Sequence, residues 1–218
     1  MLVSSGRESI MGHKFAEIAF TPTVKKAQEH NGSRRSYARL EEGDAHHDRL
    51  GAREAAFIVE RDSFYMATVS ETGWPYIQHR GGPAGFVCIL DDKTIGFADF
   101  SGNRQYVSVG NLQTDDRVSL FFMDYPNQTR LKLLGHARLI EAGDAKLLER
   151  LQVPDYGARI ERGMVITIEG YDWNCPQHIT PRFTQAQVLS MVAPLRDRVA
   201  ELESALADAG VRHQKAIP

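Results

Sequence analysis

Hydroxyl, amide and guanidinium side chains gather where a predicted strand gives way to a predicted helix. The strand ends at Asp99, and the chain then turns through Ser101, Asn103, Arg104 and Gln105. Small polar side chains leave the first N–H groups of a helix free to face an anion, and Arg104 adds a positive charge. The pattern predicts a phosphate-binding turn. A well-capped helix whose arginine faces water is the alternative, and the pattern alone does not decide between them.

Two other stretches concentrate polar side chains. One is Gln78-His79-Arg80-Gly81-Gly82, at the end of another predicted strand. The second is a loop over residues 173–182, in which two prolines prevent regular structure. A loop rich in aromatic and hydrogen-bonding groups usually lines a site. The alternative is a rim loop in which Trp173 covers one end of the fold.

Cys175 lies in this loop, but Pro176 follows it directly and no helix start lowers its pKa, so we predict an unreactive thiol.

Composition limits the classes of partner. The chain has 218 residues, 42% of them hydrophobic, and 26 Lys+Arg against 28 Asp+Glu give a net charge of −2. No broad basic field is present for nucleic acid or a membrane surface. Two cysteines and no long apolar run predict a cytoplasmic protein.

The run Asp44-Ala45-His46-His47-Asp48 holds metal-ligand types, but adjacent histidines do not easily turn to one ion, so we expect a polar loop without a metal.

Alternating and β-branched stretches predict six or seven antiparallel strands. Short spacing between them, with few helices, argues for a closed or nearly closed barrel, so the fold class is mainly β with peripheral helices (α+β). The predicted strands cover residues 64–70, 74–80, 86–90, 94–99, 117–123, 129–140 and 164–171.

Helix signals appear around this β-rich region. Pro22 after Thr21 starts a helix that Asn31-Gly32 ends, and Asp48 is the expected cap of a helix over 48–61. Two more helices are expected over 103–112 and 144–151. The basic segment 34–39 is either an arm that reaches a partner subunit or a solvated surface strap. The predicted organisation is an N-terminal extension (1–47), a barrel domain (48–182) and a C-terminal helix (183–218).

The C-terminal helix carries a regular apolar seam. Thr184 with Gln187 forms a capping box, and Pro194 is expected to kink the helix or split it in two. We expect a dimer contact here, the alternative being a helix packed on its own barrel. The seam has the coiled-coil spacing of four, three, four, three and four residues through Val188, Val192, Leu195, Val199, Leu202 and Leu206.

Residues 64–140 and 173–182 together resemble the pyridoxamine 5'-phosphate oxidase-like flavoproteins, the FMN-binding split-barrel family. The resemblance covers about two thirds of the chain and implies a homodimer with FMN at the subunit interface. In the family, a strand–turn–helix binds the FMN phosphate, and Ser101, Asn103, Arg104 and Gln105 match that segment. The preceding strand of the family contacts flavin and phosphate, which implies roles for Gln78, His79, Arg80 and Gly81, with Asp99 on the next strand.

The same resemblance implies further cofactor contacts from distant parts of the chain. Arg130, near the start of the long strand, matches a residue that reaches the partner subunit's FMN. Trp173 and Arg182 match a late tryptophan and arginine that close over the flavin. The residues that lie between those two are Asn174, Gln177 and His178.

This chain departs from the oxidase at several positions. The oxidase's first-strand arginine is Gln78 here, its later lysine is Pro83, and the lysine of its phosphate triplet is Gln105. The cluster that holds the phosphate of the vitamin substrate has no match between Glu141 and Gly163. The resemblance therefore implies the split barrel and FMN, but not a vitamin B6 substrate.

Three functions follow from these observations. The first is an FMN-dependent oxidoreductase that acts on a small molecule. The second keeps the fold but binds deazaflavin F420 or haem, as relatives in the family do. The third is a flavin carrier or sensor without catalysis. Fold-level kinship does not fix the chemistry, and we identify no catalytic residue from the sequence.

Overall fold

The computed structural model describes residues 12–42, 45–141, 143–173 and 176–209. The chain forms two compact units, of which the first comprises Met1–Asp124 and Thr129–Gln177. The second comprises Tyr125–Gln128 and His178–Pro218. The predicted organisation into residues 1–47, 48–182 and 183–218 stays a prediction.

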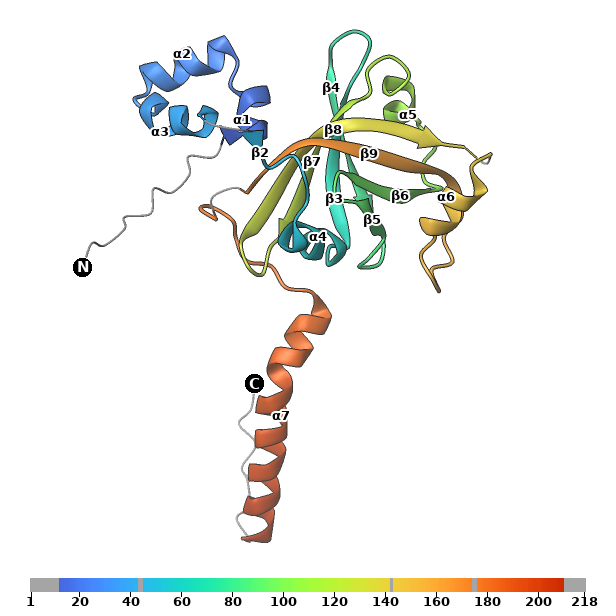
Figure 1. Cartoon of the computed structure of the whole chain (residues 1–218). Coiled ribbons are helices and arrows are strands. Elements are labelled where there is room, and N and C mark those ends of the chain that lie inside the picture. The colour runs from blue at the N-terminus through green and yellow to red at the C-terminus, as the bar shows by residue number, and fades with distance from the viewer. Residues whose placement is uncertain (1–11, 43–44, 142, 174–175, 210–218) are drawn as a thin grey trace, which may run out of the picture. The chain divides into compact units, whose positions relative to one another are not determined.

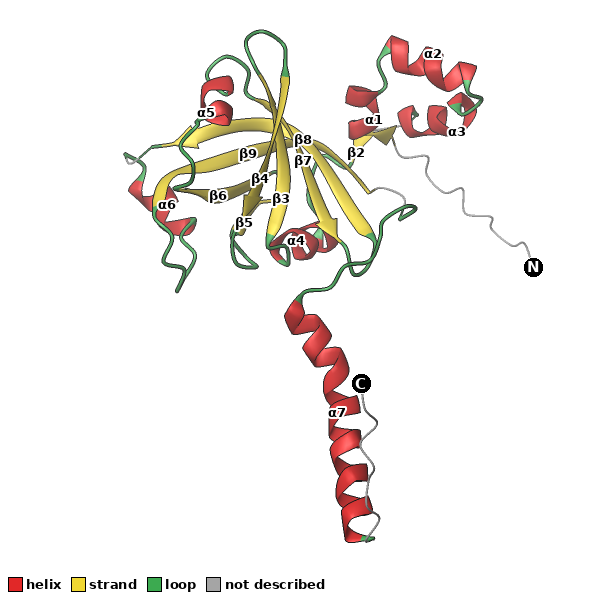
Figure 2. Cartoon of the chain, turned by 180° about the vertical axis from the view of Figure 1, so that it is seen from behind, coloured by secondary structure: helices red, strands yellow, loops and turns green. Residues whose placement is uncertain are grey.

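Seven strands of the first unit form one antiparallel sheet in the order β4-β3-β7-β8-β9-β6-β5. Figures 1 and 2 show this sheet strongly curved, with helices α4, α5 and α6 at its margins. The strands are β3 (Ser63–Val69), β4 (Pro75–Gly81), β5 (Val87–Asp91), β6 (Thr94–Phe100), β7 (Arg117–Asp124), β8 (Thr129–Ile140) and β9 (Ile160–Trp173).

The sheet is a split barrel and does not close. Strands β4 and β5 are its two edges, and no ladder joins them among the described residues. The expectation of a closed or nearly closed barrel is therefore wrong in its degree of closure, while the antiparallel split-barrel class is confirmed. Large aromatic side chains lie inside the curve, where the Phe64 ring stacks on Phe86 and on Phe122.

Several of the strand predictions succeed because burial alternates along the strand. In β3 the side chains of Phe64, Met66 and Thr68 are buried while their neighbours are not, and β8 alternates in the same way. A strand with one buried face needs this period of two. The predicted strand 129–140 is confirmed in full as β8. Strand β9 is longer than predicted and also covers Ile160 to Gly163 and Asp172 to Trp173.

The N-terminal part of the first unit is helical. Helix α2 confirms the predicted start, because Pro22 occupies the first turn and the Thr21 side chain accepts a hydrogen bond from the Val24 N–H. The basic segment 34–39 forms a short helix up to Ala38 and begins a 3-10 turn at Arg39, and Arg34 pairs with Glu41. These elements are β1 (Gly12–His13), α1 (Lys14–Ala19), α2 (Pro22–His30), α3 (Arg34–Ala38), a 3-10 turn (Arg39–Glu41) and β2 (Ala45–His46).

The helix after β2 begins later than the sequence suggests. Helix α4 (Ala52–Val59) has Gly51 at its N-cap, and Asp48 instead pairs with Lys93 at 2.8 Å. Asp48 therefore does not cap the helix, because an ion pair across the fold occupies its carboxylate. Residues 43–44 of the acidic and histidine-rich run lie outside the described residues. Within the described ranges, no three His, Cys, Asp or Glu side chains are arranged to hold a metal ion.

Two further helices complete the chain. Helix α6 (Ala145–Arg150) is capped by Asp144, which confirms the predicted position. Helix α7 (Gln185–Asp208) is one continuous helix that includes Pro194, so it is not split in two, and the alternative of a kink at Pro194 stays a prediction. Its Thr184–Gln187 capping box is confirmed. No helix in the described part of the chain is both long and apolar enough to cross a membrane.

Gly135 lies at a close contact between β8 and β9. The register of the two strands shifts between Leu134 and Gly135, and a Cβ added at Gly135 would lie 2.3 Å from the Thr167 carbonyl oxygen. We expect Gly135→Ala to lower the free energy of unfolding by about 1–3 kcal/mol, because the backbones must separate to admit the methyl group. Chemical denaturation measures the loss.

Gly110→Ala is the matched control, because a Cβ added at Gly110 in helix α5 (Val107–Asn111) meets no atom within 4 Å. We expect this variant to be as stable as the original chain or slightly more stable, since alanine favours a helix over glycine. Equal stability of the two variants would contradict the account of the β8–β9 contact.

Candidate functional site

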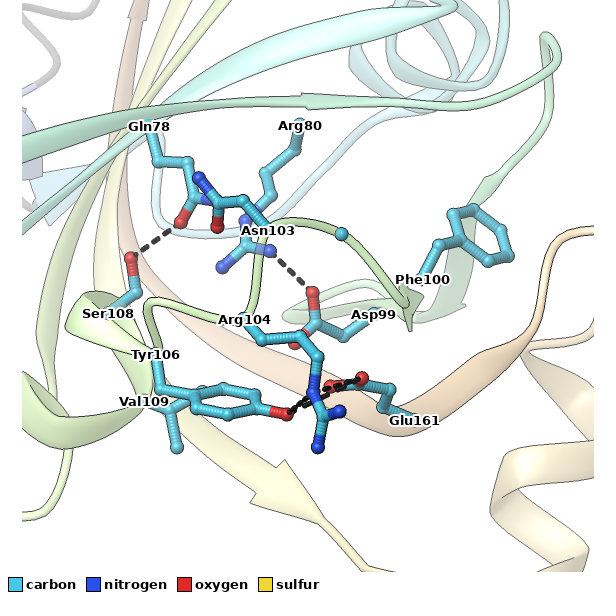
Figure 3. Close-up of a pocket in the computed structure, with 11 residues that line it drawn as sticks. Gln78, Arg80, Asp99, Phe100, Asn103, Arg104, Tyr106, Ser108, Val109 and Glu161 are labelled. Carbon is cyan, nitrogen blue, oxygen red and sulfur yellow. Dashed lines mark hydrogen bonds and ion pairs between the residues drawn. The ribbon is translucent and has the colours of Figure 1, made fainter.

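The site lies where the sheet fails to close. β5 begins at Val87, which pairs with Phe97, so Ala98, Asp99 and Phe100 of β6 extend past their β5 neighbour. Residues of edge strand β4 face this free end of β6 and line a cavity with it. Figure 3 shows Gln78 and Arg80 on one side of the cavity and Asp99 on the other.

The cavity has a volume of about 250 Å³ and mostly polar walls. A second cavity of about 180 Å³ shares Gln78, Arg80 and Asp99 with it and continues toward His79 and Gly81. Preformed concave spaces with a few convergent polar groups are typical of small-molecule sites. The residues lining the first cavity are Gln78, Arg80, Asp99, Phe100, Gly102, Asn103, Arg104, Tyr106, Ser108, Val109 and Glu161.

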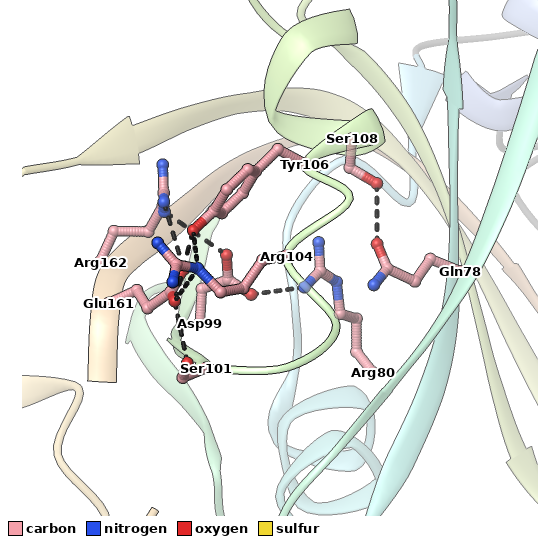
Figure 4. A network of polar contacts seen from close by, with 9 residues as sticks. All are labelled: Gln78, Arg80, Asp99, Ser101, Arg104, Tyr106, Ser108, Glu161 and Arg162. Atoms are coloured by element: carbon pink, nitrogen blue, oxygen red, sulfur yellow. Dashed lines mark hydrogen bonds and ion pairs between the residues drawn. The ribbon is translucent and has the colours of Figure 1, made fainter. Parts of the chain in front are cut away.

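A buried carboxylate ties the walls of the cavity together. Asp99 is buried and forms an ion pair with Arg80 across the open edge, and Arg162 of β9 lies 3.7 Å from its second oxygen. Burial raises the pKa of Asp99 above its ordinary value, and the two guanidinium groups oppose that rise. Figure 4 shows the network. The Arg80–Asp99 pair replaces the missing strand pairing with an electrostatic link.

Glu161 is a second carboxylate, and hydrogen-bond donors surround it. It accepts hydrogen bonds from the Ser101 hydroxyl at 2.9 Å and the Tyr106 hydroxyl at 3.5 Å. Arg162 lies 3.4 Å and Arg104 lies 4.0 Å from its oxygens. The hydrogen bond from Ser101 is the main cause that holds the pKa of Glu161 below its usual range. These donors form a site that suits an anion, and the chain's own carboxylate occupies it.

The loop after β6 has an unusual backbone. Arg104 and Tyr106 adopt left-handed conformations, with φ angles of 59° and 55°. Such conformations are uncommon outside glycine and tend to occur at functional sites. They also prevent a helix from starting at Asn103, so α5 begins only at Val107. The predicted helix 103–112 is therefore wrong at its start, and any anion binding depends on the loop and its arginines.

Polar contacts hold the short helix α5 on the sheet. Ser108 donates a hydrogen bond to the Gln78 side-chain oxygen at 3.1 Å, and Asn111 donates to the Thr68 hydroxyl at 2.9 Å. The Asn103 side chain accepts a hydrogen bond from the Gln105 N–H within the loop, at 3.2 Å. These contacts position Tyr106 and Arg104 beside Glu161, where the Tyr106 ring also faces Arg162 at 5.2 Å.

The donors of this site fit an anionic group. The Nε atoms of Arg80 and Arg162 are buried and have no hydrogen-bond partner in the described structure. A buried donor without a partner costs free energy, which a ligand oxygen would recover. The Arg104 side chain is 70% exposed at the cavity, so its guanidinium remains open to a ligand. Three arginines against two carboxylates leave the site suited to a phosphate group.

The structure brings together part of the predicted site. Gln78, Arg80, Asp99, Asn103 and Arg104 line the first cavity. Three more predicted residues lie beside them, since His79 and Gly81 line the second cavity and Ser101 binds Glu161. Gln105 lies in the same loop, and its backbone N–H is bound to Asn103.

Two of the other predicted residues, Trp173 and Arg130, do not line this cavity. Trp173 is at the opposite end of β9 from Glu161, up to about 40 Å away along the strand at about 3.3 Å per residue. Its indole N–H donates to Glu54 at 2.7 Å, and its ring packs against Phe57. Arg130 is in β8 opposite Met123, and Gln177 is in the first unit. His178 and Arg182 belong to the second unit, and Asn174 lies outside the described residues.

Four polar residues of the site were not predicted from the sequence: Tyr106, Ser108, Glu161 and Arg162. Glu161 and Arg162 reach the site only because β9 pairs with β6, with Arg162 opposite Asp99. Both residues are more than 50 positions away in the chain from Asp99 and Arg104, so no local sequence pattern predicts that they lie at the site. Tyr106 and Ser108 follow the polar turn directly and alternate with apolar residues. This alternation was the sequence pattern from which their place at the site could have been predicted.

Comparison with known proteins adds a family match. Residues 50–177 match the family model described as Pyridoxamine 5'-phosphate oxidase. No curated protein matches the sequence. Several solved structures share parts of the fold, each with a TM-score below 0.5. At this level of similarity we infer nothing about ligands or activity from them.

Three of these structures illustrate the likeness. HupZ of Group A Streptococcus has 16% identity and a TM-score of 0.47, over 62% of this chain and 100% of that one. An FMN-binding protein from Syntrophomonas wolfei has 15% identity and a TM-score of 0.44, over 56% and 85%. A protein related to general stress protein 26, from Clostridium acetobutylicum, has 17% identity and a TM-score of 0.41, over 59% and 88%.

Proposed function

Because the chain belongs to the pyridoxamine 5'-phosphate oxidase family, we propose that it is an FMN-dependent oxidoreductase that acts on a small molecule as a homodimer. The observation that supports this most directly is the polar cavity at the open edge of the barrel. Arg80 of β4 and Arg104 of the loop after β6 line it, and the buried Nε of Arg80 has no hydrogen-bond partner among the described residues. Arg162 of β9 lies behind its wall, 3.7 Å from Asp99.

The phosphate end of FMN would be held by the loop after β6. Arg104 provides an exposed guanidinium, and the Ser101 hydroxyl contacts the same Glu161 oxygen, Oε1, that Arg104 approaches. Guanidinium groups bind phosphate oxygens with paired, charge-assisted hydrogen bonds. The buried Nε of Arg80, which has no hydrogen-bond partner among the described residues, would find an acceptor among the ligand's oxygens. In this way the ligand would satisfy a donor that the chain alone leaves without a hydrogen bond.

The remaining walls would orient the rest of the ligand. Gln78 and Ser108 present an amide and a hydroxyl group to the cavity, held together by their own hydrogen bond. When bound, FMN supplies the electron or hydride transfer, while the protein positions it and limits access. We assign no general acid or base, because both carboxylates of the cavity, Asp99 and Glu161, already pair with arginines.

A homodimer accounts for two further observations. The β3–β4 hairpin exposes Tyr65, Trp74 and Ile77, the last two to 76% and 64%. Large apolar side chains at the surface indicate a contact with another protein. A second copy would also be able to supply residues that one chain holds away from its own cavity, such as Arg130. Both observations support a site shared between two subunits.

Purified full-length protein tests the proposal. We expect it to carry a yellow flavin whose mass is that of FMN, and to oxidise NADH or NADPH once fully loaded. An F420 or haem spectrum would overturn the FMN assignment. Colourless protein that does not bind added FMN would overturn it as well. If FMN binds and neither nicotinamide nor a panel of small-molecule donors reduces it, the protein is a flavin carrier and not an oxidoreductase.

A further inference from the structure

Helix α7 carries an apolar seam, which we define as Val188, Val192, Leu195, Val199, Leu202 and Leu206. Val188, Val192, Leu195, Val199 and Leu202 are exposed, to between 38% and 66%. The helix is 24 residues long and continuous, and its N-terminus is capped by Thr184 and Gln187. A helix with a large exposed apolar face gains most of its stability from packing against a partner. We therefore expect another protein surface to pack against the seam and bury it.

The period of the seam indicates what that occupant is. Apolar residues spaced alternately four and three apart follow a 3.5-residue repeat, whereas a straight helix has 3.6 residues per turn. A strict 3.5-residue repeat keeps the seam facing a second helix that winds around the first. Pro194 lies on the outer side of the helix in this arrangement, between Val192 and Leu195, and does not interrupt the seam.

From this period and the residue types of the seam, we propose that α7 forms a parallel, in-register, two-stranded coiled coil with α7 of a second copy of this chain. In the centre of the seam, Val192 and Val199 fall at the heptad position called a, and Leu195 and Leu202 at position d. At its two ends Val188 falls at d and Leu206 at a. In parallel coils, valine at a with leucine at d favours two strands, so the centre of the seam fits a dimer.

Charges beside the seam support the parallel direction. Arg198 occupies position g and Glu203 the following position e, which face each other between two parallel helices. Each coil would contain this pair twice, once on each side. If two α7 helices paired antiparallel along the whole seam, they would cross at its midpoint, Asp197. Arg196 of one helix would then lie near Arg196 of the other, and Arg198 near the other Arg198. The antiparallel arrangement would therefore bring like charges together.

The seam spans just under three heptads. We therefore expect the coil to contribute to dimer strength together with any contact made by the first unit, and the test uses the full chain. In one chain, Arg198 lies 2.8 Å from Glu201, so a charge reversal also disturbs a contact within the helix. The design must separate the two effects.

Two charge reversals provide that separation. Arg198→Glu and Glu203→Arg should each weaken the homodimer about 3–10-fold in sedimentation or dilution experiments, because each creates two like-charge pairs. An equimolar mixture of the two variants should recover the affinity of the original chain, since every pair in the mixed dimer is attractive. The mixture leaves the contacts within each helix unchanged. Failure of the mixture to recover affinity would overturn the proposal.

Cysteine crosslinking tests direction and register in the full chain with Cys88 and Cys175 replaced by serine. In the parallel coil, Leu202→Cys lies beside its own copy and should form a disulfide-linked dimer. Asp197→Cys, on the outer side of the helix, is the matched control and should stay monomeric on a non-reducing gel. Crosslinking of Leu202→Cys only with Val192→Cys would show an antiparallel pair, and no crosslinking would show that another surface covers the seam. Either result overturns the proposal.

Discussion

We expect Asp99→Ala to lower the free energy of unfolding by about 3–5 kcal/mol, the usual effect of removing one partner of a buried ion pair. Asp99 is buried, and the guanidinium groups of Arg80 and Arg162 both face its carboxylate. Without the carboxylate, the Arg80 side chain, which is 12% exposed, remains charged and loses its ion-pair partner. The open edge between β4 and β6 also loses its electrostatic link. Urea denaturation at neutral pH measures the change.

Asp92→Ala is the matched control for this prediction. Asp92 pairs with Arg49 at 2.8 Å, and both side chains are more than half exposed, so it is an aspartate–arginine pair open to water. Exposed pairs contribute little, because water solvates each charge after its partner is removed. We expect a clearly smaller loss than at Asp99. Equal losses for the two variants would show that burial of the Arg80–Asp99 pair does not determine its energetic role.

We expect Arg104→Glu to weaken FMN binding about 100-fold or more while leaving the fold intact. A charge-assisted hydrogen bond to phosphate is worth about 1.5–3 kcal/mol, and tenfold in affinity corresponds to about 1.4 kcal/mol. The new carboxylate would also stand next to Glu161 and repel the phosphate. Because the Arg104 side chain is 70% exposed, its replacement should not disturb the core. Flavin fluorescence titration measures the dissociation constant.

Two comparisons make the assignment specific. Riboflavin lacks the phosphate, so its affinity should change far less than that of FMN in the Arg104→Glu variant. Arg117→Glu changes an exposed arginine of β7 outside the cavity and should bind FMN as the original chain does. If Arg104→Glu protein still co-purifies with stoichiometric FMN, the phosphate does not bind at this loop.

Glu161→Gln should act in the opposite direction. Its carboxylate holds the Ser101 hydroxyl and lies near Arg104 and Arg162, which are the groups proposed to bind phosphate. Glutamine keeps the size of the side chain but removes the charge that competes with the ligand. The Ser101 hydrogen bond lowers the pKa of Glu161, so the carboxylate is ionised at neutral pH and the competition is present there. Tighter FMN binding in the same titration supports this arrangement, and weaker binding contradicts it.

Local patterns in the sequence predicted the elements that local physics controls. Alternation along 129–140 identified β8, and the Thr21–Pro22 and Thr184–Gln187 signals identified two helix starts. Each depends on neighbours within a few residues, such as the Gln187 N–H that the Thr184 hydroxyl binds. The polar turn with Ser101, Asn103 and Arg104 was identified in the same way, from residue types alone.

Helix starts failed where a contact across the fold decided the outcome. Asp48 has the residue type of a cap, but its carboxylate pairs with Lys93. The helix has Gly51 as its N-cap and begins at Ala52. Asn103 looked like the start of a helix, but left-handed backbone at Arg104 and Tyr106 delays it to Val107. The contacts of Arg104 and Tyr106 with Glu161, a residue of another strand, accompany that conformation.

The sequence by itself determined the strand periodicity and the polar turn after Asp99, because each follows from residues that are neighbours in the chain. The split-barrel class was implied by the resemblance to a known family and not by these local patterns. Only the tertiary structure decided where the sheet stays open and which charges meet there. Arg80, Asp99, Glu161 and Arg162 come from three strands, and strand register, set by packing of the whole core, brings them together. An ion pair between distant residues leaves no periodic signal in the chain, so the electrostatics of the cavity required the fold.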